Sequence, residues 1–478
     1  MMGVEAFDAV VIGAGQAGPF LAAKLVAQGR RVALIESRDL GGTCVNRGCT
    51  PTKTLRKSAR VAYLARRAAE FGVNIGPVEV DFAVAMRRMQ QRVDESRAGL
   101  QAWLGRLGGL DIIKAHGRLA GREAGEFLVT AGDRTLRAPK VVLNTGTRPF
   151  LPSIPGLAAQ AHLDNETLLK LRERPRKLVI IGGGYISMEM GQIFRRLGSK
   201  VAIVETDARL ISREDADVSV AMTDMLRAEG IDLFIGQAIQ QVRPGDTEGG
   251  ICVELADGRI IGGSHLLVAT GRAPNTDDLG LETVGLKPNE RGYVVTDDRL
   301  ETDVPGIWAL GDINQRGSFT HTSYHDHEIL AENLGGGKRS ADARTGIYAV
   351  FTDPPLAHVG LYEADARRLV AQGRRISQAV HAMKDVSRAK EESETIGLIK
   401  LLIDEDSGHF LGATMMGIEA DEIIQAIGLV MAANGTWRAV RDALPVHPTV
   451  TEFLPTIIDR RRPLMAAADQ QKDVRIAN

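Results

Sequence analysis

A local pattern of apolar run, glycine turn, amphipathic stretch and acidic residue occurs twice in this chain and leaves few folds open to it. One apolar run ends in Gly13 and another ends in Gly182. After each amphipathic stretch a second apolar run closes on a glutamate, Glu36 in the first copy and Glu205 in the second, and the same number of positions separates glycine from glutamate in both. Each copy therefore predicts a strand, a helix and a second, parallel strand.

The glycines of the two turns suit a dinucleotide. They are Gly13, Gly15 and Gly18 in the first copy and Gly182 and Gly184 in the second. The first glycine permits a tight turn, the second lets the backbone approach a pyrophosphate at the helix N-terminus, and the glutamate accepts hydrogen bonds from a ribose. Ser187 replaces the third small residue of the second copy, so we expect that helix to lie farther from its strand. The alternative is two structural turns without nucleotides.

The glutamate that ends the second copy, Glu205, also indicates which nucleotide binds there. A carboxylate at Glu205 disfavours a 2′-phosphate, so the second site is predicted to prefer NAD. Arg209 and Arg213 lie close enough in sequence to leave NADPH use open.

Two of the three cysteines, Cys44 and Cys49, lie five positions apart, and the third is Cys252. In an ideal helix such positions have Cα atoms roughly 8.6 Å apart, whereas a disulfide needs about 4.4–6.8 Å. The backbone between them must therefore turn more tightly than a helix, which Asn46 and Gly48 allow. We interpret the pair as a redox-active disulfide, since its loop is too short for a structural staple. A metal site and incidental buried thiols are the alternatives.

Composition limits the class of protein. A chain of 478 residues is too long for one core and predicts about three domains. The 59 basic and 60 acidic residues give a net charge of −1, so no nucleic-acid partner and no membrane surface are expected. No apolar run is long enough to span a bilayer, and the first predicted strand begins too early to leave room for a signal peptide. We therefore expect a cytoplasmic protein.

Three further turns follow short apolar runs. Their residues are Thr145 and Gly146, Gly271 and Arg272, and Gly311 and Asp312. The first two form a matched pair of crossings, each predicted to mark a hinge between domains. Asp312 is placed to hydrogen-bond a polyol or ribityl chain, and helix capping is an alternative compatible with that role.

Together these motifs resemble the class I pyridine nucleotide-disulfide oxidoreductases. The resemblance rests on the two glycine turns, the C-x4-C-x-P-x-K segment from Cys44 to Lys53, the ending at Asp312, and the segment from His447 to Glu452. It implies an α/β fold with two Rossmann-like nucleotide-binding domains and a C-terminal α+β dimerisation domain. The implied FAD-binding domain spans residues 1–150 and 270–345, the NAD(P)-binding domain 151–269 and the dimerisation domain 346–478.

The resemblance also implies roles for individual residues. Cys49 would be the charge-transfer thiolate beside the flavin of FAD, and Cys44 the interchange thiol that attacks substrate. Lys53 would lie by the flavin and pair with Glu189, and Tyr185 would cover the nicotinamide pocket. Cofactor contacts are implied for the turn residues above and for Gly42 and Thr43. Without the motifs, Lys53 and Glu189 read as ordinary surface charges and Tyr185 as packing.

His447 stands between Pro445 and Pro448, which restrict its backbone to extended geometry. Glu452 follows within reach of the imidazole and could orient and charge it. A general acid-base near neutral pKa is what thiolate leaving groups need, although a structural histidine is the alternative. By resemblance, this pair acts on the disulfide of the partner subunit of a homodimer. The other histidines, including His321, His325 and His327, favour packing over metal binding.

The electron acceptor is less well defined. No cysteine follows Cys252, so the C-terminal cysteine pair of the usual mercuric reductases is missing. Arg47, Thr50 and Thr52 are similar to bacterial flavoproteins related to mercuric reductase, among them a copper-ion reductase. We interpret the chain as reducing a metal ion or another small oxidant, with dihydrolipoamide-type dithiol/disulfide exchange as the alternative. A redox-sensing or scaffold flavoprotein with little turnover is a third interpretation, which the intact cysteine and histidine set disfavours. Arg47 is either a cation that lowers a thiol pKa or a solvent-facing arginine.

Overall fold

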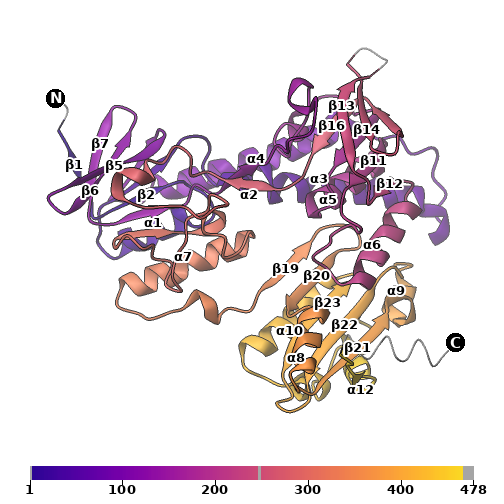
Figure 1. The fold of residues 1–478 in the computed structure, drawn as a ribbon. Coiled ribbons are helices and arrows are strands. Elements are labelled where there is room, and N and C mark those ends of the chain that lie inside the picture. Colours follow the sequence, from indigo (N-terminus) through magenta and orange to yellow (C-terminus); the bar gives the residue numbers. More distant parts are fainter. Residues whose placement is uncertain (1–2, 246–248, 467–478) are drawn as a thin grey trace.

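The computed structural model of the protein describes residues 3–245 and 249–466. Figure 1 shows three lobes, each built on its own sheet. We call them the N-terminal lobe (sheet β18-β8-β2-β3-β4), the central lobe (sheet β12-β11-β10-β16) and the C-terminal lobe (sheet β19-β20-β23-β22-β21-β24). The outermost residues of the expected FAD-binding and dimerisation domains, 1–2 and 467–478, lie outside the described part.

The N-terminal lobe has a parallel five-stranded sheet. Its strands are β2 (Ala9–Ile12), β3 (Val32–Glu36), β4 (Leu110–Lys114), β8 (Val141–Leu143) and β18 (Ile307–Ala309). All four residues of β2 are buried, as expected where both faces of a parallel sheet are covered. Helices α1 (Gly18–Ala27) and α7 (Thr320–Leu334) pack on the face that Ala9 and Val11 supply.

Val10 and Ile12 point to the opposite face and pack against a second, four-stranded sheet in the order β1-β7-β6-β5. Strands β5 to β7 are antiparallel, and β1 joins β7 in parallel. The strands are β1 (Glu5–Ala6), β5 (Gly117–Glu123), β6 (Glu126–Ala131) and β7 (Arg134–Ala138). The alternation of residues along β2 therefore places one nucleotide-type sheet between a helical layer and a β layer.

The central lobe repeats this plan. Its parallel strands are β10 (Lys177–Ile181), β11 (Lys200–Glu205), β12 (Asp232–Ile235) and β16 (His265–Val268). Helices α5 (Tyr185–Arg196) and α6 (Ala216–Ala228) cover the face of Leu178 and Ile180. The face of Val179 and Ile181 packs on an antiparallel sheet of β13 (Ile239–Pro244), β14 (Ile251–Leu255) and β15 (Ile260–Gly263). The sequence repeat is thus matched by a repeat of architecture.

Two kinds of connection join these lobes. The two predicted crossings lead into strands β9 (Thr147–Pro149) and β17 (Arg272–Pro274). These two strands pair antiparallel with each other. The helices α2 (Gly42–Arg47), α3 (Cys49–Arg66) and α4 (Phe82–Leu104) carry the chain from the N-terminal lobe toward the central lobe (Figure 1).

The C-terminal lobe is an antiparallel six-stranded sheet with flanking helices. Its strands are β19 (Ile347–Val350), β20 (Leu356–Gly360), β21 (Ile376–Ala382), β22 (Leu398–Asp404), β23 (Phe410–Met416) and β24 (Arg462–Pro463). Its helices are α8 (Glu363–Ala371), α9 (Ser387–Glu391), α10 (Ala420–Ala432), α11 (Trp437–Arg441) and α12 (Leu454–Asp459). The predicted fold class, two Rossmann-like domains and a C-terminal α+β domain, is confirmed.

One core cluster crosses the lobe boundaries. Leu55 of α3 and Met188 of α5 belong to the same apolar cluster as Val350 of β19. At its edge the buried Asp353 accepts hydrogen bonds from Arg60 of α3, at 3.0 Å, and from Arg196 of α5. Helix α3 is therefore held in place by the central and C-terminal lobes.

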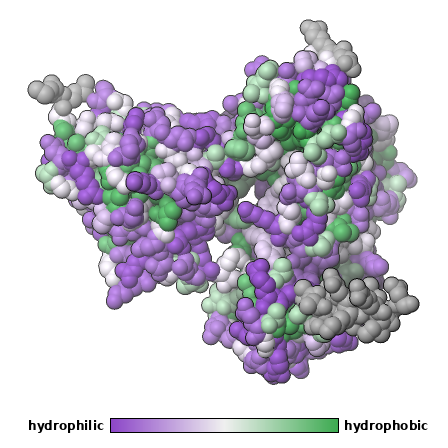
Figure 2. Space-filling view, in the orientation of Figure 1, coloured by the Kyte–Doolittle hydropathy of each residue, from purple (hydrophilic) through white to green (hydrophobic). Residues whose placement is uncertain are grey.

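Figure 2 shows a surface on which hydrophilic residues predominate, with a hollow between the N-terminal lobe and the other two. Within residues 3–245 and 249–466, no helix combines the length and the apolar character that a membrane span requires.

Candidate active site

Cys44 lies in α2 and Cys49 is the first residue of α3, so a break between two helices separates them. Gly48 forms this break with ψ −114°, and a Cβ at this position would lie 3.0 Å from the Thr43 carbonyl oxygen. Both cysteines are free thiols, and both are half-buried. The break brings the two thiols close enough to shift each other's pKa, which a continuous helix would not allow.

The two thiols differ in acidity because they share a proton. A hydrogen bond from Cys44 lowers the pKa of Cys49 to about 6, against the opposing effect of burial, and Thr320 and the charge of Lys53 lower it further. The same contact, together with burial, raises the pKa of Cys44. Thr320 Oγ1 lies 3.3 Å from Cys49 Sγ. At neutral pH, Cys49 is therefore the thiolate and Cys44 the protonated thiol.

Lys53 lies one helical turn beyond Cys49 on α3 and forms an ion pair across the lobe boundary. Its Nζ is 2.9 Å and 3.1 Å from the two carboxylate oxygens of Glu189 on α5. Glu189 also accepts a hydrogen bond of 2.8 Å from the Phe351 amide, and Lys53 Nζ lies 4.5 Å from the centroid of the Phe351 ring. All three lobes thus contribute to the surroundings of the sulfur pair.

The first glycine turn leaves no space for side chains. A Cβ at Gly13 would lie 2.3 Å from the Asn144 carbonyl oxygen, and one at Gly18 would lie 2.2 Å from the Gly13 carbonyl oxygen. A Cβ at Gly42 would lie 2.8 Å from Gly15 Cα, so the cysteine segment packs directly on the turn. This close backbone packing at the start of α1 fits the pyrophosphate of FAD.

The acid of the first copy is held in the same region. Glu36 accepts hydrogen bonds from the amides of Ala14, at 2.8 Å, and Arg38, at 2.7 Å. These bonds fix the carboxylate at the end of β3, where a ribose can reach it. Thr43, on the adjoining helix α2, is exposed.

The second turn has the same geometry with one difference. A Cβ at Gly182 would lie 2.5 Å from the Ala269 carbonyl oxygen, whereas nothing lies within 4 Å of one at Gly184. Glu205 accepts hydrogen bonds from the amides of Gly183 and Asp207. Ser187 is fully buried at the position where Gly18 of the first copy has no room for a Cβ, so the backbone of the second turn leaves space for a side chain there. The open space above Gly184 fits a dinucleotide.

The two crossings meet at Asp312. Arg272 donates to the Thr147 hydroxyl at 2.6 Å and to its carbonyl at 2.7 Å, and this hydroxyl lies 3.1 Å from Asp312. Burial raises the pKa of the Asp312 carboxyl, while the charge of Arg272 opposes this. Thr145 donates to the Asn275 carbonyl at 2.9 Å, which joins the first crossing to the residue after β17.

The backbone of the crossings is confined to glycine-type conformations at Gly146 (φ +63°), Gly271 (φ +127°) and Gly311 (φ +73°). Gly311 begins the short 3₁₀ helix that carries Asp312. The cradle around Asp312 therefore consists of backbone turns in conformations that glycine adopts most readily, which suits a bound polyol chain.

His447 and Glu452 form a hydrogen-bonded pair on the C-terminal lobe. His447 Nδ1 lies 2.7 Å from Glu452 Oε2, and the His447 side chain is 77% exposed. Glu452 lies in a 3₁₀ turn, Thr451–Phe453, just before α12. The imidazole is oriented by the carboxylate, and its Nε2 side is open to solvent or to a partner.

The expectation that Arg47 faces solvent was wrong. Its guanidinium is 13% exposed and forms ion pairs with Asp39 and with Glu166, the latter at 3.2 Å. Arg47 therefore does not face solvent. It ties the cysteine segment to the start of the central lobe.

The three histidines of α7 lie in packed surroundings. His321 contacts the Ile347 carbonyl oxygen at 2.6 Å, His325 contacts Arg339 at 2.7 Å, and His327 is 1% exposed. In the part of the chain that the structure describes, no group of three or more His, Cys, Asp or Glu side chains could hold a metal ion.

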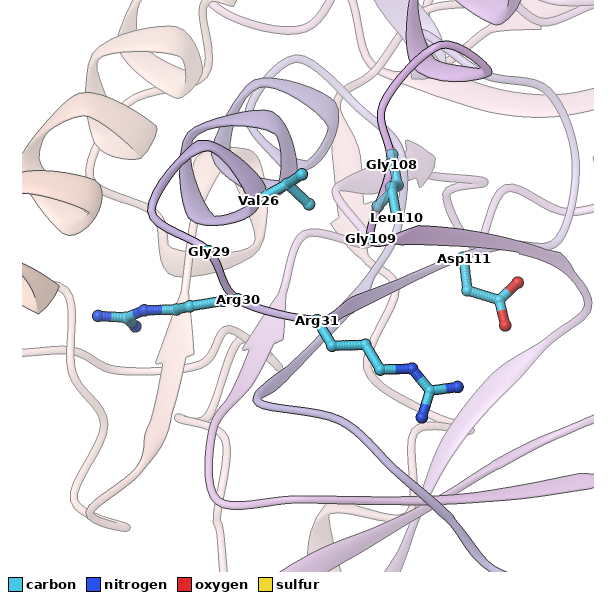
Figure 3. A pocket seen from close by; sticks show the side chains of 8 residues that line it. All are labelled: Val26, Gly29, Arg30, Arg31, Gly108, Gly109, Leu110 and Asp111. Carbon is cyan, nitrogen blue, oxygen red and sulfur yellow. The ribbon is translucent and has the colours of Figure 1, made fainter.

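A surface pocket lies elsewhere, between the end of α1 and the start of β4 (Figure 3). Its lining residues are Val26, Gly29, Arg30, Arg31, Gly108, Gly109, Leu110 and Asp111. Arg30 and Arg31 point in opposite directions, away from its middle. None of the predicted site residues lines it, so we do not assign it to the active site.

Comparison with known proteins identifies the family. Residues 7–326 match the profile described as pyridine nucleotide-disulphide oxidoreductase. The chain belongs to this family. Residues 347–458 match the dimerisation domain of the same family. The protein is therefore a FAD- and NAD(P)H-dependent oxidoreductase.

Its relatives carry different names. The chain is 33% identical over 453 residues to a probable pyridine nucleotide-disulfide oxidoreductase, RclA, of Escherichia coli, covering 94% of this chain and 98% of the relative. It is 31% identical to a dihydrolipoyl dehydrogenase of Chlamydia muridarum, covering 94% and 95%. It is 30% identical to a mercuric reductase of Staphylococcus aureus, covering 94% and 81%.

A solved structure is similar over nearly the whole chain. It is described as a Cu(II) complex of the HOCl-induced flavoprotein disulfide reductase RclA from Escherichia coli, and its TM-score is 0.86 at 32% identity. The match covers 95% of this chain and 99% of that one.

Sequence reasoning missed two residues that brace this site. Asn144 is buried, accepts a hydrogen bond of 2.9 Å from the Gly18 amide and donates one of 2.8 Å to the Leu310 carbonyl. An asparagine directly after a buried strand was a signal that could have found it. Thr320, which contacts Cys49, had no such signal, because nothing near it in sequence points to a thiol.

Proposed function

We propose that this protein passes electrons from NAD(P)H through FAD and the Cys44–Cys49 pair to a small oxidant, with a thiophilic metal ion such as Cu(II) or Hg(II) as the preferred acceptor. The observation that carries the proposal is the sulfur pair itself, a low-pKa Cys49 beside a protonated Cys44. Oxidation of the Cys49 thiolate and the Cys44 thiol to a disulfide releases two electrons and one proton, and two electrons are enough to reduce two Cu(II) to Cu(I) or one Hg(II) to Hg(0).

The two sulfurs have different tasks in this proposal. Cys44 is the interchange thiol that binds the acceptor, and it needs a base because its pKa is raised. In the reduced pair, Cys49 is a thiolate beside Lys53, whose charge favours the anion. Bound FAD would supply the electrons that reopen the disulfide, with the nicotinamide as their source. The positive charge of Lys53, which Glu189 holds in position, would favour the reduced, electron-rich form of the flavin.

We assign the cofactors to the two glycine turns. FAD contacts are proposed for Gly13, Gly15, Gly18, Glu36, Gly42, Thr43, Lys53, Thr145, Gly146, Gly271, Arg272, Gly311 and Asp312. NAD(P)H contacts are proposed for Gly182, Gly184, Tyr185 and Glu205. NADH is the preferred donor, because the Glu205 carboxylate, held by the amides of Gly183 and Asp207, would repel a 2′-phosphate.

We also propose a homodimer in which His447 serves the sulfur pair of the other subunit. The His447 side chain is 77% exposed and leaves room for a group of another subunit to approach. Glu452 orients its imidazole for proton transfer. Leu444 and Val446, just before His447, are 97% and 74% exposed, as expected of apolar residues that a partner covers.

The acceptor is tested by an anaerobic assay of NADH and NADPH oxidation with Cu(II), Hg(II), lipoamide, glutathione disulfide and a quinone. Cu(I) is measured with a chromogenic chelator, and Cys44→Ser gives the rate that does not pass through the sulfurs. We expect kcat/KM for a metal ion to exceed that for lipoamide at least tenfold. A higher value for lipoamide would instead support dihydrolipoamide-type exchange and contradict the metal acceptor.

A further inference from the structure

The three residues that follow β19, Phe351 to Asp353, connect the C-terminal lobe to the two helices that carry the charged pair of the active site. Each helix contributes three side chains at the spacing i, i+3, i+7, which places them on one face of the helix. They are Lys53, Arg56 and Arg60 on α3, and Glu189, Gln192 and Arg196 on α5. The two helices therefore meet at one short segment of backbone.

The backbone after Phe351 is tightly held. The Thr352 carbonyl accepts two hydrogen bonds from the Arg56 guanidinium, at 3.1 Å and 2.9 Å. The Gln192 side chain donates to the Asp353 carbonyl and accepts from the Asp353 amide, both at 2.8 Å. Thr352 is 0% exposed and Asp353 is 6% exposed. Phe351 is therefore attached to a backbone with little freedom to move.

Phe351 contacts both members of the active-site ion pair. Its amide donates at 2.8 Å to Glu189 Oε1, the oxygen that also lies 3.1 Å from Lys53 Nζ. Its ring faces the same Nζ, which lies 4.5 Å from the ring centroid. This distance is within the range of a cation–π contact. One residue of the C-terminal lobe thus touches the carboxylate through its backbone and the ammonium through its side chain.

The ammonium needs such a second contact to be confined. The Lys53 side chain is 31% exposed, against 12% for Glu189. Within residues 3–245 and 249–466, Glu189 supplies the only hydrogen-bond acceptors of Lys53 Nζ. An ammonium has three N–H groups on a flexible stem, so two carboxylate oxygens alone leave it several positions. The ring face of Phe351 narrows them to one side of the pair.

We propose that Phe351 is a positioning residue for flavin reduction, and that the electron-rich face of its ring keeps the Lys53 ammonium beside the flavin. The inference rests on the proposed place of Lys53 and is independent of which oxidant the enzyme reduces. A positive charge at this place favours the reduced flavin. The usual strength of a cation–π contact corresponds to a factor of about two to five in the equilibrium constant for flavin reduction. For a two-electron couple this factor equals about 10–20 mV.

The test replaces Phe351 in the holoenzyme by phenylalanines that carry one, two or three ring fluorines. Fluorine withdraws electron density from the ring face and nearly preserves the shape of the ring, so it weakens the cation–π contact and leaves the packing in place. The midpoint potential of the flavin is measured at anaerobic equilibrium with a reference dye. We expect it to decrease stepwise with the number of fluorines, by about 10–20 mV in total.

Phe7 offers a matched control. The Arg31 guanidinium lies 4.3 Å from the centroid of its ring, in the N-terminal lobe and away from the ion pair. The same fluorinated series at Phe7 should leave the potential unchanged. An equal decrease at Phe7 and Phe351 would show a general effect of fluorine and overturn the inference.

Lys53→Met separates the inference from the proposed function on which it rests. Loss of the charge should lower the equilibrium constant for flavin reduction at least tenfold, or about 30 mV, and fluorination of Phe351 should then have no further effect. An unchanged potential in Lys53→Met would contradict the place of Lys53 beside the flavin, and with it the inference. A decrease in Lys53→Met without any decrease in the fluorinated series would overturn the role of Phe351 alone. So would a decrease in Phe351→Leu that trifluorination does not reproduce, because the ring would then act through its shape.

Discussion

The contact between Cys49 and Thr320 allows a quantitative test of how this fold makes a thiolate. Thr320 Oγ1 lies 3.3 Å from Cys49 Sγ and is one of the groups that lower the pKa of Cys49 to about 6. Thr320→Val replaces the hydroxyl by a methyl group of similar size and keeps the helix N-terminus of α7 in place. We expect the pKa of Cys49 to rise.

The magnitude follows from the value of one charge-assisted hydrogen bond. Such a bond contributes about 1.5–3 kcal/mol, and one pKa unit corresponds to about 1.4 kcal/mol. The thiolate keeps its bond from Cys44 and the charge of Lys53, so we expect the lower end of this range, a rise of about one unit. At pH 6 the thiolate fraction should then fall from about one half to about one tenth. Reactivity that depends on the thiolate is lost as pH decreases, and this loss begins at higher pH in the variant.

The measurement is the rate of alkylation of the NADH-reduced enzyme by iodoacetamide as a function of pH, with the Cys49 peptide quantified by mass spectrometry. Thr320→Ser restores a hydroxyl and should return the midpoint to that of the parent. Thr322→Val makes the same substitution on the same helix without a contact to the sulfur and should leave it unchanged. An unchanged midpoint in Thr320→Val, or an equal shift in Thr322→Val, would refute the reasoning.

Two other predictions test the proposed roles of exposed groups. His447→Ala should lower turnover with a disulfide or metal acceptor at least a hundredfold, as expected on loss of a general acid-base, and leave reduction of ferricyanide by NADH nearly unchanged. Mixed dimers of His447→Ala and Cys44→Ser should regain one working site each, and no recovery on co-expression would contradict a site shared between subunits. Glu205→Ser removes a carboxylate from the ribose position and should raise the NADPH/NADH ratio of kcat/KM at least tenfold. An unchanged ratio in steady-state kinetics would show that Glu205 does not select the donor.

The local parts of this structure were predictable because short-range rules determine them. Glycine at positions 13 and 182 is required by backbone contacts that the strand–turn–helix pattern already implies. The break at Gly48 followed from the Cα separation that a disulfide between Cys44 and Cys49 requires. The fold class followed from the repeat and the family resemblance, while the boundaries between domains and the roles of individual site residues stay predictions.

The remainder depended on contacts between distant segments. Thr320 lies 271 positions from Cys49, and Phe351 lies 162 positions from Glu189, so neither partner could be read from its neighbours. The burial of Arg47 was not foreseen for the same reason, because its partner Glu166 lies more than 100 positions away at the start of the central lobe. The effect of a charged residue on a neighbouring pKa cannot be predicted from the sequence until its ion-pair partner is known.

Helix α3 belongs to the N-terminal lobe by chain order, yet Leu55 packs in a core shared with α5 and β19, and Arg60 binds the buried Asp353. A fragment ending before residue 346 would leave this helix without part of its apolar support and without a counter-ion for Arg60. The arrangement of Cys44 and Cys49 thus depends on the whole polypeptide. If the chain is shortened from its C-terminal side, the geometry of the two sulfurs should be lost before that of the two glycine turns. Attempts to alter which oxidant is accepted are better directed at the loops around Cys44 than at exchanging entire lobes between relatives.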